Sequence, residues 1–264
     1  MNRLLFLMIL LLLPSIALAG PPPKAEELEL VVSLNDKKVG SEVLRTQSGQ
    51  EGRHDSIEAN LQDKVQKVWK QFQQRATLER ETDGTVKSYR RAIYVKGATI
   101  LTNLFNYNGG WRVGAQADAG SKPKVTDVKV KMPFVVLDER AVSLVVIAAE
   151  QLARHGDADY VRVDNATYGR LALTTETLTA DGKQWTRLHL RDGKAMHLEV
   201  LKNSAGHVVQ IKGLDGWSGL AAGQKVPAHL ESVTAETTKP AELPQTPTPT
   251  HKPVTPPKPR QVLP

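Results

Sequence analysis

Apolar and polar residues alternate along much of the chain between residues 27 and 231, and short turn signals separate the alternating runs. In residues 28–34, Leu28, Leu30 and Val32 alternate with polar or smaller neighbours and end at Asn35-Asp36. A period of two predicts a strand with one buried face. Asn-Gly or Asp-Gly between two such runs predicts a hairpin, because both central residues of its tight turn need a positive φ. Further signals are Asp83-Gly84, Asn108-Gly109-Gly110, Asp181-Gly182, Asp192-Gly193 and residues 203–206.

The alternation is clearest on the two sides of Asp192-Gly193, where it predicts a hairpin with one apolar and one polar face. The apolar face would carry Thr186, Leu188, Leu190, Met196, Leu198 and Val200. The polar face would carry Trp185, Arg187, His189, His197 and Glu199.

Residues 141–152 follow a helical period instead of an alternating one. Their apolar positions are Ala141, Val142, Leu144, Val145, Val146, Ile147, Ala148, Ala149 and Leu152. We expect Asp138 to cap the start of this helix, and Gly156 to stop it after the basic residues Arg154 and His155. Because the apolar stripe is so wide, we expect the helix to be deeply buried.

Residues 57–72 leave two readings open. Their apolar positions fit a helical period, but the segment could equally be two strands. With that segment undecided, the chain is predicted to be mainly β (α+β). Its expected architecture is a curved antiparallel β-meander, or half-barrel, packed on a buried helix.

The two ends of the chain differ in composition from the middle. Arg3, an apolar stretch over residues 4–13 and the Ala17-Leu18-Ala19 site have the layout of a secretory signal peptide, with cleavage expected after Ala19. The apolar stretch is shorter than the roughly 20 residues that a spanning helix needs. We therefore expect a signal peptide over residues 1–19, an extended spacer over 20–26 and a β-rich domain over 27–231. The protein is then expected to be periplasmic or secreted, with no transmembrane segment after cleavage.

Residues 232–264 are rich in proline, threonine and lysine, and we expect them to form a disordered tail. The chain has a formal net charge of +7, and the tail carries four basic residues from Lys239 onward against one acid. The rest is only mildly basic and has no nucleic-acid-binding signature, so a nucleic-acid partner is not expected. No cysteine is present, which excludes disulfides, thiolate metal sites and cysteine nucleophiles.

Aromatic residues are the candidates for lining an apolar ligand pocket inside the curved sheet, although ordinary core or hairpin-packing residues are the simpler interpretation. The candidate pocket residues are Trp69, Phe72, Tyr94, Phe105, Trp111, Phe134 and Trp185.

Motifs that would indicate catalysis or a metal are incomplete. Gly216-Trp217-Ser218-Gly219-Leu220 comes close to a nucleophile elbow but lacks the final glycine, so a tight turn is the better interpretation. His189 and His197 could face each other across a hairpin, which makes a two-histidine metal site conceivable. Without an evident third ligand, no metal or cofactor is expected, and no catalytic residue is assigned.

Three short motifs resemble those of periplasmic β-proteins of unknown function that are similar to the lipoprotein-carrier-like fold. They are residues 35–42 with Val39-Gly40 and Glu42, residues 79–84 followed by Tyr89, and residues 132–138 with Pro133-Phe134 and Leu137-Asp138. The resemblance covers roughly residues 27–215. It implies a curved antiparallel sheet around one or more helices, located in the envelope, with no catalytic residues to carry over.

These observations favour a non-enzymatic secreted or periplasmic bacterial protein that binds an apolar or envelope-derived ligand, such as a lipid, or a partner protein. One alternative is an envelope scaffold that acts through its tail. The other is a hydrolase acting on an envelope polymer or ester, which is supported only by the expected location and by the segment around Ser218.

Overall fold

The computed structural model describes residues 24–65, 68–117, 120–193 and 196–232. These residues belong to the first of two units into which the chain divides, Met1–Val233 and Thr234–Pro264. The expected signal peptide and the tail beyond residue 232 lie outside the described residues. The first strand already begins at Lys24, within the expected spacer, because Lys24 pairs with Ser48 of the second strand.

Strands make up most of the described chain, as the alternation predicts. In the first half they are β1 (Lys24–Leu34), β2 (Lys37–Gly49), β3 (Gly52–Val65), β4 (Val68–Arg80), β5 (Val86–Val95), β6 (Ala98–Tyr107), β7 (Gly110–Gln116) and β8 (Lys124–Val128). The second half contains β9 (Phe134–Leu137), helix α2 (Leu144–His155), β10 (Ala158–Arg162), β11 (Thr167–Ala180), β12 (Lys183–Asp192), β13 (Met196–Lys202), β14 (Val208–Lys212), β15 (Trp217–Ala221) and β16 (Glu231–Ser232).

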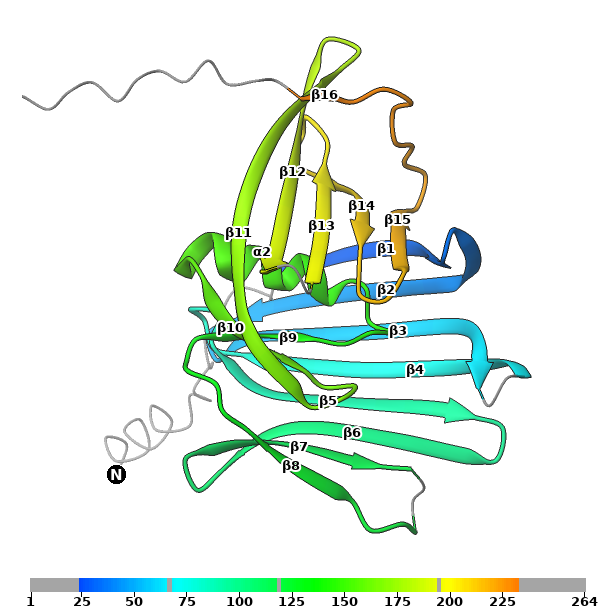
Figure 1. The fold of residues 1–264 in the computed structure, drawn as a ribbon, viewed down its shortest axis with the longest axis vertical. Coiled ribbons are helices and arrows are strands. Elements are labelled where there is room, and N and C mark those ends of the chain that lie inside the picture. The colour runs from blue at the N-terminus through cyan, green and yellow to red at the C-terminus, as the bar shows by residue number, and fades with distance from the viewer. Residues whose placement is uncertain (1–23, 66–67, 118–119, 194–195, 233–264) are drawn as a thin grey trace, which may run out of the picture. The chain divides into compact units, whose positions relative to one another are not determined.

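The strands form one open curved sheet of two meanders. One meander runs from β8 back to β1, the other from β15 back to β10, and the antiparallel pairing of β1 with β15 joins them. Strand β9 pairs with β10 in parallel, because α2 carries the chain across between them. Figure 1 shows β1–β8 running across the view and β11–β14 running up it, with α2 behind them. The predicted curved antiparallel meander is thus confirmed, with one parallel pair added.

The undecided segment 57–72 forms two strands, β3 and β4, which pair along their length with Leu61 opposite Phe72. On β3 the buried positions Ile57, Ala59 and Leu61 recur every second residue. The apolar residues of these two paired strands, taken together along the chain, happen to recur at a helical spacing.

Three of the predicted hairpin turns have a positive φ at both central residues: Asn35-Asp36 (49° and 64°), Asn108-Gly109 (51° and 78°) and Asp181-Gly182 (51° and 69°). Asp83-Gly84 instead lies in the connection between β4 and β5, which is closed by a hydrogen bond from the Glu81 amide to the Thr85 carbonyl. The tight turn predicted from Gly216 onward lies at Asp215-Gly216, with φ of 49° and 82°, because β15 already begins at Trp217.

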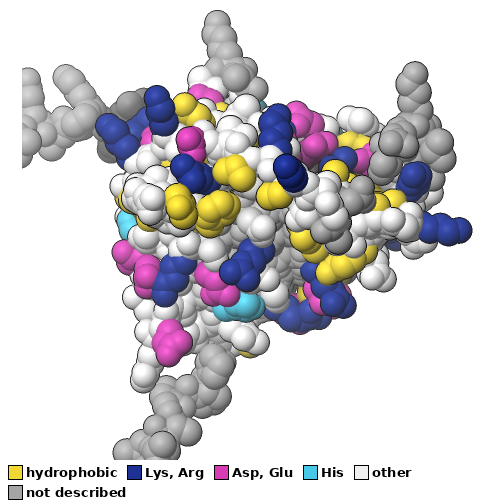
Figure 2. Space-filling model, turned by 90° about the horizontal axis from the view of Figure 1, so that it is seen from below, with side chains coloured by type: hydrophobic (Ala, Val, Ile, Leu, Met, Phe, Trp, Pro, Cys, Tyr) yellow, Lys and Arg dark blue, Asp and Glu magenta, His cyan; other side chains and the backbone are white. Residues whose placement is uncertain are grey.

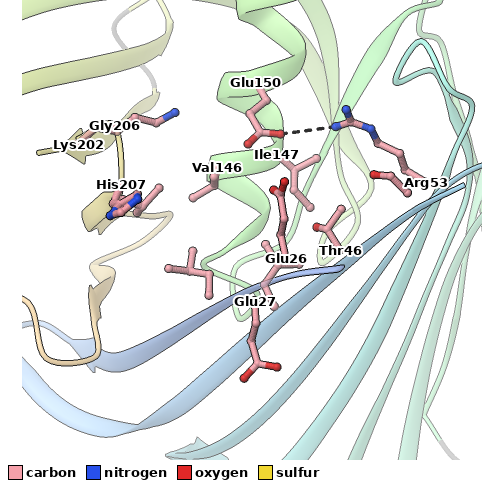
Figure 3. A pocket seen from close by; sticks show the side chains of 14 residues that line it. Glu26, Glu27, Thr46, Arg53, Val146, Ile147, Glu150, Lys202, Gly206 and His207 are labelled. Carbon is pink, nitrogen blue, oxygen red and sulfur yellow. Dashed lines mark ion pairs between the residues drawn. The ribbon is translucent and has the colours of Figure 1, made fainter. Parts of the chain in front are cut away.

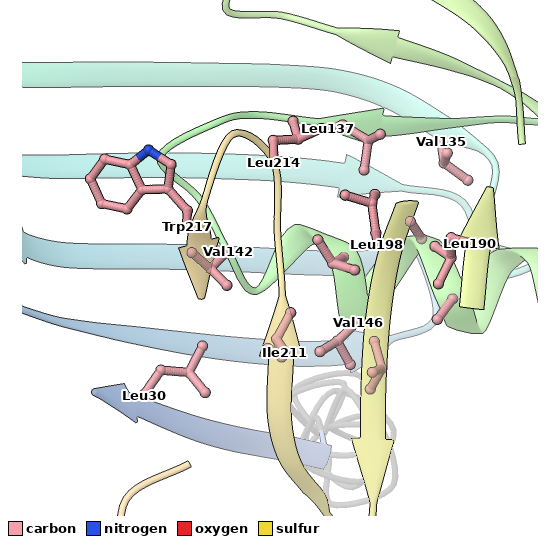
Figure 4. Packing of buried hydrophobic residues seen from close by; sticks show 14 of the residues in the cluster. Leu30, Val135, Leu137, Val142, Val146, Leu190, Leu198, Ile211, Leu214 and Trp217 are labelled. Atoms are coloured by element: carbon pink, nitrogen blue, oxygen red, sulfur yellow. The ribbon is translucent and has the colours of Figure 1, made fainter. Parts of the chain in front are cut away.

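Helix α2 packs against the sheet face that carries the apolar side chains of the β12–β13 hairpin. Leu190 and Leu198 belong to the same buried cluster as Val145, Val146 and other helix residues, and Figure 4 shows Leu198 and Ile211 beside Val146. Because its apolar stripe is wide, eight of the helix residues are buried. The prediction of a deeply buried helix is therefore confirmed.

The surface carries charges of both signs. In Figure 2, Lys and Arg side chains lie among Asp and Glu, with small hydrophobic patches between them. Among the described residues, none forms a helix both long and apolar enough to cross a membrane.

Candidate functional site

A cavity of about 440 Å³ lies between the start of β1, the middle of β2, the helix and the β13–β14 connection. Its volume falls in the range of about 300–1,000 Å³ that is typical of small-molecule sites. The lining residues are Glu26, Glu27, Leu28, Leu44, Thr46, Ser48, Arg53, Val146, Ile147, Glu150, Lys202, Gly206, His207 and Val208. We call this cavity the helix groove.

The helix groove exists because the two meanders separate on one side of their junction. Strand β15 pairs with β1 only from Leu30 to Leu34. The preceding part of β1, residues 24–29, continues along β2 without β15 beside it. Helix α2 lies below this gap and contributes Val146, Ile147 and Glu150 to its wall.

The walls of the helix groove combine apolar and charged groups. The apolar side chains come from β1, β2, α2 and β14, and they are Leu28, Leu44, Val146, Ile147 and Val208.

The charged groups of the groove lie on both sides of α2. Figure 3 shows Arg53 and Glu26 on one side of the helix and Lys202 and His207 on the other. Arg53 Nη1 lies 4.0 Å from Glu150 Oε2, and both side chains are partly exposed, so this ion pair contributes little to stability. The guanidinium group therefore stays accessible to a ligand.

Two further cavities adjoin the helix groove. One of about 390 Å³ shares Glu26, Arg53, Glu150 and Lys202 with it and continues along the helix towards Arg154. The other, of about 500 Å³, surrounds the β2–β3 turn and is lined by polar residues and glycines only. The helix groove has five aliphatic side chains in its wall, whereas the 390 Å³ cavity has Leu188 and two alanines, so the groove is the better candidate for holding a ligand with an apolar part.

The start of α2 is held by a carboxylate from the sheet. Glu42 is fully buried on β2, and its two oxygens accept hydrogen bonds from the backbone amides of Val142 (3.1 Å) and Ser143 (2.7 Å). Burial raises the pKa of Glu42 to about 7, against the lowering effect of the hydrogen bonds from Ser143 and Val142. Glu42 lines none of the cavities described above, so we interpret it as a group that positions the helix and thereby the groove wall.

The expectation that Asp138 caps the helix is wrong. The N-cap residue is Ser143, and Asp138 lies earlier, at the end of β9. Its buried carboxylate accepts hydrogen bonds from Tyr89 Oη (2.8 Å) and Arg91 Nη1 (2.5 Å). Burial, followed by the charge of Asp138, raises the pKa of Tyr89 well above its usual value. This network connects the segment before the helix to β5. Tyr89 and Asp138 both stand in the sequence motifs described above, but those motifs do not predict that the two residues contact each other.

The aromatic residues proposed as pocket lining are distributed over the sheet and are not gathered at one site. Phe72 belongs to the buried cluster around α2. Trp111 and Phe134 pack edge to face in a second cluster, with ring centroids 4.8 Å apart. Tyr94 is exposed, whereas Phe105 and Trp185 are half-buried. The side chain of Trp69 lies outside the described residues.

None of the six aromatic residues whose side chains the structure describes lines the helix groove or the two cavities beside it. Their role in a pocket stays a prediction. The residues that do line the groove are mostly charged or aliphatic, and they were missed because they come from segments far apart in the sequence.

The remaining sequence candidates are His189, His197 and Ser218. The two histidines do face each other, with His189 Nδ1 and His197 Nε2 2.9 Å apart. Ser218 lies within β15, opposite Ser33 of β1 and Lys212 of β14. It is therefore a strand residue and not part of the expected tight turn, and it does not occupy the strand-to-helix turn of a nucleophile elbow.

No model of a known protein family matches the chain. No curated protein matches it either. Similar solved structures include a β-barrel-like protein with the domain of unknown function DUF1849 from Brucella abortus. It is 13% identical, with a TM-score of 0.43, and the match covers 80% of this chain and 98% of that one. A DUF1089 family protein from Pseudomonas aeruginosa is 12% identical, with a TM-score of 0.39 and coverage of 68% and 92%.

Proposed function

We propose that this is a non-catalytic binding protein that acts outside the cytoplasm and holds a small amphiphilic ligand from the bacterial envelope in the helix groove. The observation that carries the proposal is the composition of the groove wall. Aliphatic side chains such as Leu44, Ile147 and Val208 line the same cavity as the charged Arg53 and Lys202. An amphiphile can place its apolar part on the former and its polar group near the latter.

The location outside the cytoplasm is part of this proposal and is supported by the signal-like residues 1–19. The proposal also includes the resemblance to proteins similar to the lipoprotein-carrier-like fold, which rests on residues 35–42, 79–84 and 132–138.

The arrangement of the charges indicates the kind of headgroup. Arg53 and Lys202 are cationic, whereas Glu150 supplies a carboxylate between them along the helix. A zwitterionic headgroup, with a phosphate near a cation and an amine near the carboxylate, would complement both signs.

Isothermal titration calorimetry with lysophosphatidylethanolamine below its micellar concentration tests the proposal. We expect one site per chain in the wild type and at least a tenfold loss of affinity in Val208→Trp, because the larger side chain fills part of the groove. Val125→Trp is the matched control, since Val125 is 48% exposed on β8 and does not line the groove. No binding to the wild type, or equal binding to Val208→Trp and Val125→Trp, would contradict the proposal.

A partner protein is the second candidate occupant, and the pairing of β1 favours it. The pairing of β1 with β15 ends at Leu30, and one further backbone hydrogen bond runs from the Ala222 amide to the Glu29 carbonyl, so residues 24–28 present the strand edge beside the groove. An extended peptide could add to such an edge by backbone hydrogen bonds. Chemical-shift changes confined to the amides of residues 24–28 on adding a partner would support this mode, and an unchanged spectrum would exclude it.

A further inference from the structure

A second cluster of polar side chains lies on the sheet face opposite α2. Strands β12 and β13 pair with His189 directly opposite Glu199 and with Arg191 opposite His197. Since side chains alternate along a strand, His189, His197 and Glu199 all project from the same face. Leu198 and Val200 project from the other face, into the core around the helix.

The three side chains converge on one point. His189 Nδ1 lies 2.9 Å from His197 Nε2 and 3.6 Å from Glu199 Oε1, and His197 Nε2 lies 3.4 Å from the same oxygen. Zinc binds histidine nitrogen and carboxylate oxygen at about 2.0–2.2 Å, which in a tetrahedral site places two ligand atoms about 3.3–3.6 Å apart. The two edges that end on Glu199 Oε1, 3.6 and 3.4 Å, lie in this range, and the 2.9 Å edge between the two imidazole nitrogens would have to lengthen by about 0.4 Å, which small side-chain movements allow.

We propose that His189, His197 and Glu199 bind a divalent transition-metal ion, with zinc as the best match. Two imidazoles and one carboxylate are a ligand set that such ions favour, whereas Ca²⁺ and Mg²⁺ require mainly oxygen ligands. Within the described chain, this is the one group of at least three histidine or acidic side chains whose ligand atoms approach within 4.8 Å of one another.

A surrounding layer of hydrogen bonds already orients the ligands. His189 Nε2 lies 3.2 Å from Glu176 Oε2, and Glu176 is itself held by Arg187 Nη1 (3.1 Å) and by the Ser232 hydroxyl. An N–H donor at Nε2 leaves the lone pair of His189 Nδ1 directed at the cluster. Carboxylate–histidine pairs of this kind fix the tautomer of metal-binding histidines. Glu176 is therefore a positioning residue for the proposed site.

The second oxygen of Glu199 is also occupied. Lys212 Nζ lies 2.8 Å from Glu199 Oε2, which leaves Oε1 on the side of the two histidines. The two nearby carboxylates are thus balanced by Lys212 and Arg187. Because these two positive charges offset the negative charges of the carboxylates, the site attracts hard cations less strongly, and the imidazole nitrogens determine which metal binds.

The proposed site is open to solvent on one side. The side chains of His189 and Glu199 are 12% and 13% exposed, whereas that of His197 is 45% exposed. Three protein ligands with one accessible side are typical of zinc sites that keep a position for water or another molecule. The site is independent of the helix groove, because it lies on the opposite face of β13.

The test uses the untagged full chain, treated with a chelator and titrated with Zn²⁺ by calorimetry. We expect one Zn²⁺ per chain, no competition from excess Ca²⁺ or Mg²⁺, and a higher melting temperature with Zn²⁺. His197→Gln should lose at least tenfold in affinity, and Glu176→Gln about 10- to 100-fold as a positioning residue. X-ray absorption should show two imidazole ligands in the wild type and one in His197→Gln.

The matched control is His54→Gln. His54 also forms an exposed cross-strand pair with a glutamate, with Nδ1 2.6 Å from Glu79 Oε1, but it lies outside the cluster. This variant should bind Zn²⁺ as the wild type does. No Zn²⁺ binding by the wild type, or unchanged affinity in both His197→Gln and His189→Gln, would overturn the proposal and leave a hydrogen-bonded histidine pair only. Preferential binding of Ca²⁺ would overturn the assigned metal class.

Discussion

The buried carboxylate of Glu42 predicts how the stability of the protein depends on pH. Glu42 is fully buried, and its pKa is raised by burial from 4.5 to about 7. The folded state therefore binds this proton more tightly than the unfolded state does. Its contribution to stability is complete below pH 4.5 and is lost as the pH rises towards 7 and beyond.

The size of the effect follows from the shift. One pKa unit corresponds to about 1.4 kcal/mol, so a shift from 4.5 to about 7 amounts to about 3 kcal/mol in total. Between pH 5 and pH 8 the free energy of unfolding should then fall by roughly 2–3 kcal/mol because of Glu42.

Urea unfolding of the wild type and Glu42→Gln across this pH range isolates the effect, because all other titrating groups are shared. The difference in unfolding free energy between the two proteins should change by roughly 2–3 kcal/mol, with the wild type losing stability as the pH rises. Glu58→Gln is the control, because the side chain of Glu58 is 52% exposed. Its unfolding free energy should change with pH in parallel with that of the wild type. Parallel curves for the wild type and Glu42→Gln would refute the reasoning.

Three further substitutions test the packing. Arg80→Leu should destabilise the fold by about 3–5 kcal/mol in urea unfolding, because it removes the buried ion-pair partner of Asp55. In the wild type, Arg80 Nε lies 2.6 Å from Asp55 Oδ2. A loss below about 1 kcal/mol would contradict this reasoning. Gly52→Ala should lower the melting temperature strongly, since its Cβ would lie 2.1 Å from the Arg80 carbonyl oxygen, whereas Gly49→Ala across the hairpin meets nothing within 4 Å and should be nearly neutral. Leu198→Ala, which opens a cavity beside α2, should cost about 2–5 kcal/mol, and a neutral result would show that the helix packs elsewhere.

Local patterns in the sequence predict the secondary structure of this protein better than its binding sites. The alternation around Leu190 and Leu198 places those side chains in the core, because strand geometry alone determines which residues share a face. The turn at Asn35-Asp36 was predictable for a similar reason, since the positive φ that it needs restricts the residue types.

Contacts between distant segments could not be predicted in this way. Glu42 binds the backbone of Ser143, and nothing in the local sequence of either residue indicates the other. The helix groove depends on where β15 separates from β1, which is a property of the joined meanders.

The proposed metal site could be predicted from the sequence only in part. The hairpin pattern predicts that His189 and His197 face each other, but it does not by itself identify Glu199 as a third ligand. Its position two residues after His197, opposite His189 in the strand register, is the signal that identifies it.

Native mass spectrometry of the protein isolated from the envelope of its host tests the central claim most directly. The wild type should carry a bound small amphiphile that is released on denaturation, and Val208→Trp should carry none, whereas Val125→Trp should carry it as the wild type does. A wild-type spectrum with the mass of the polypeptide alone, or the same bound mass in Val208→Trp, would contradict the proposal that the helix groove is the binding site.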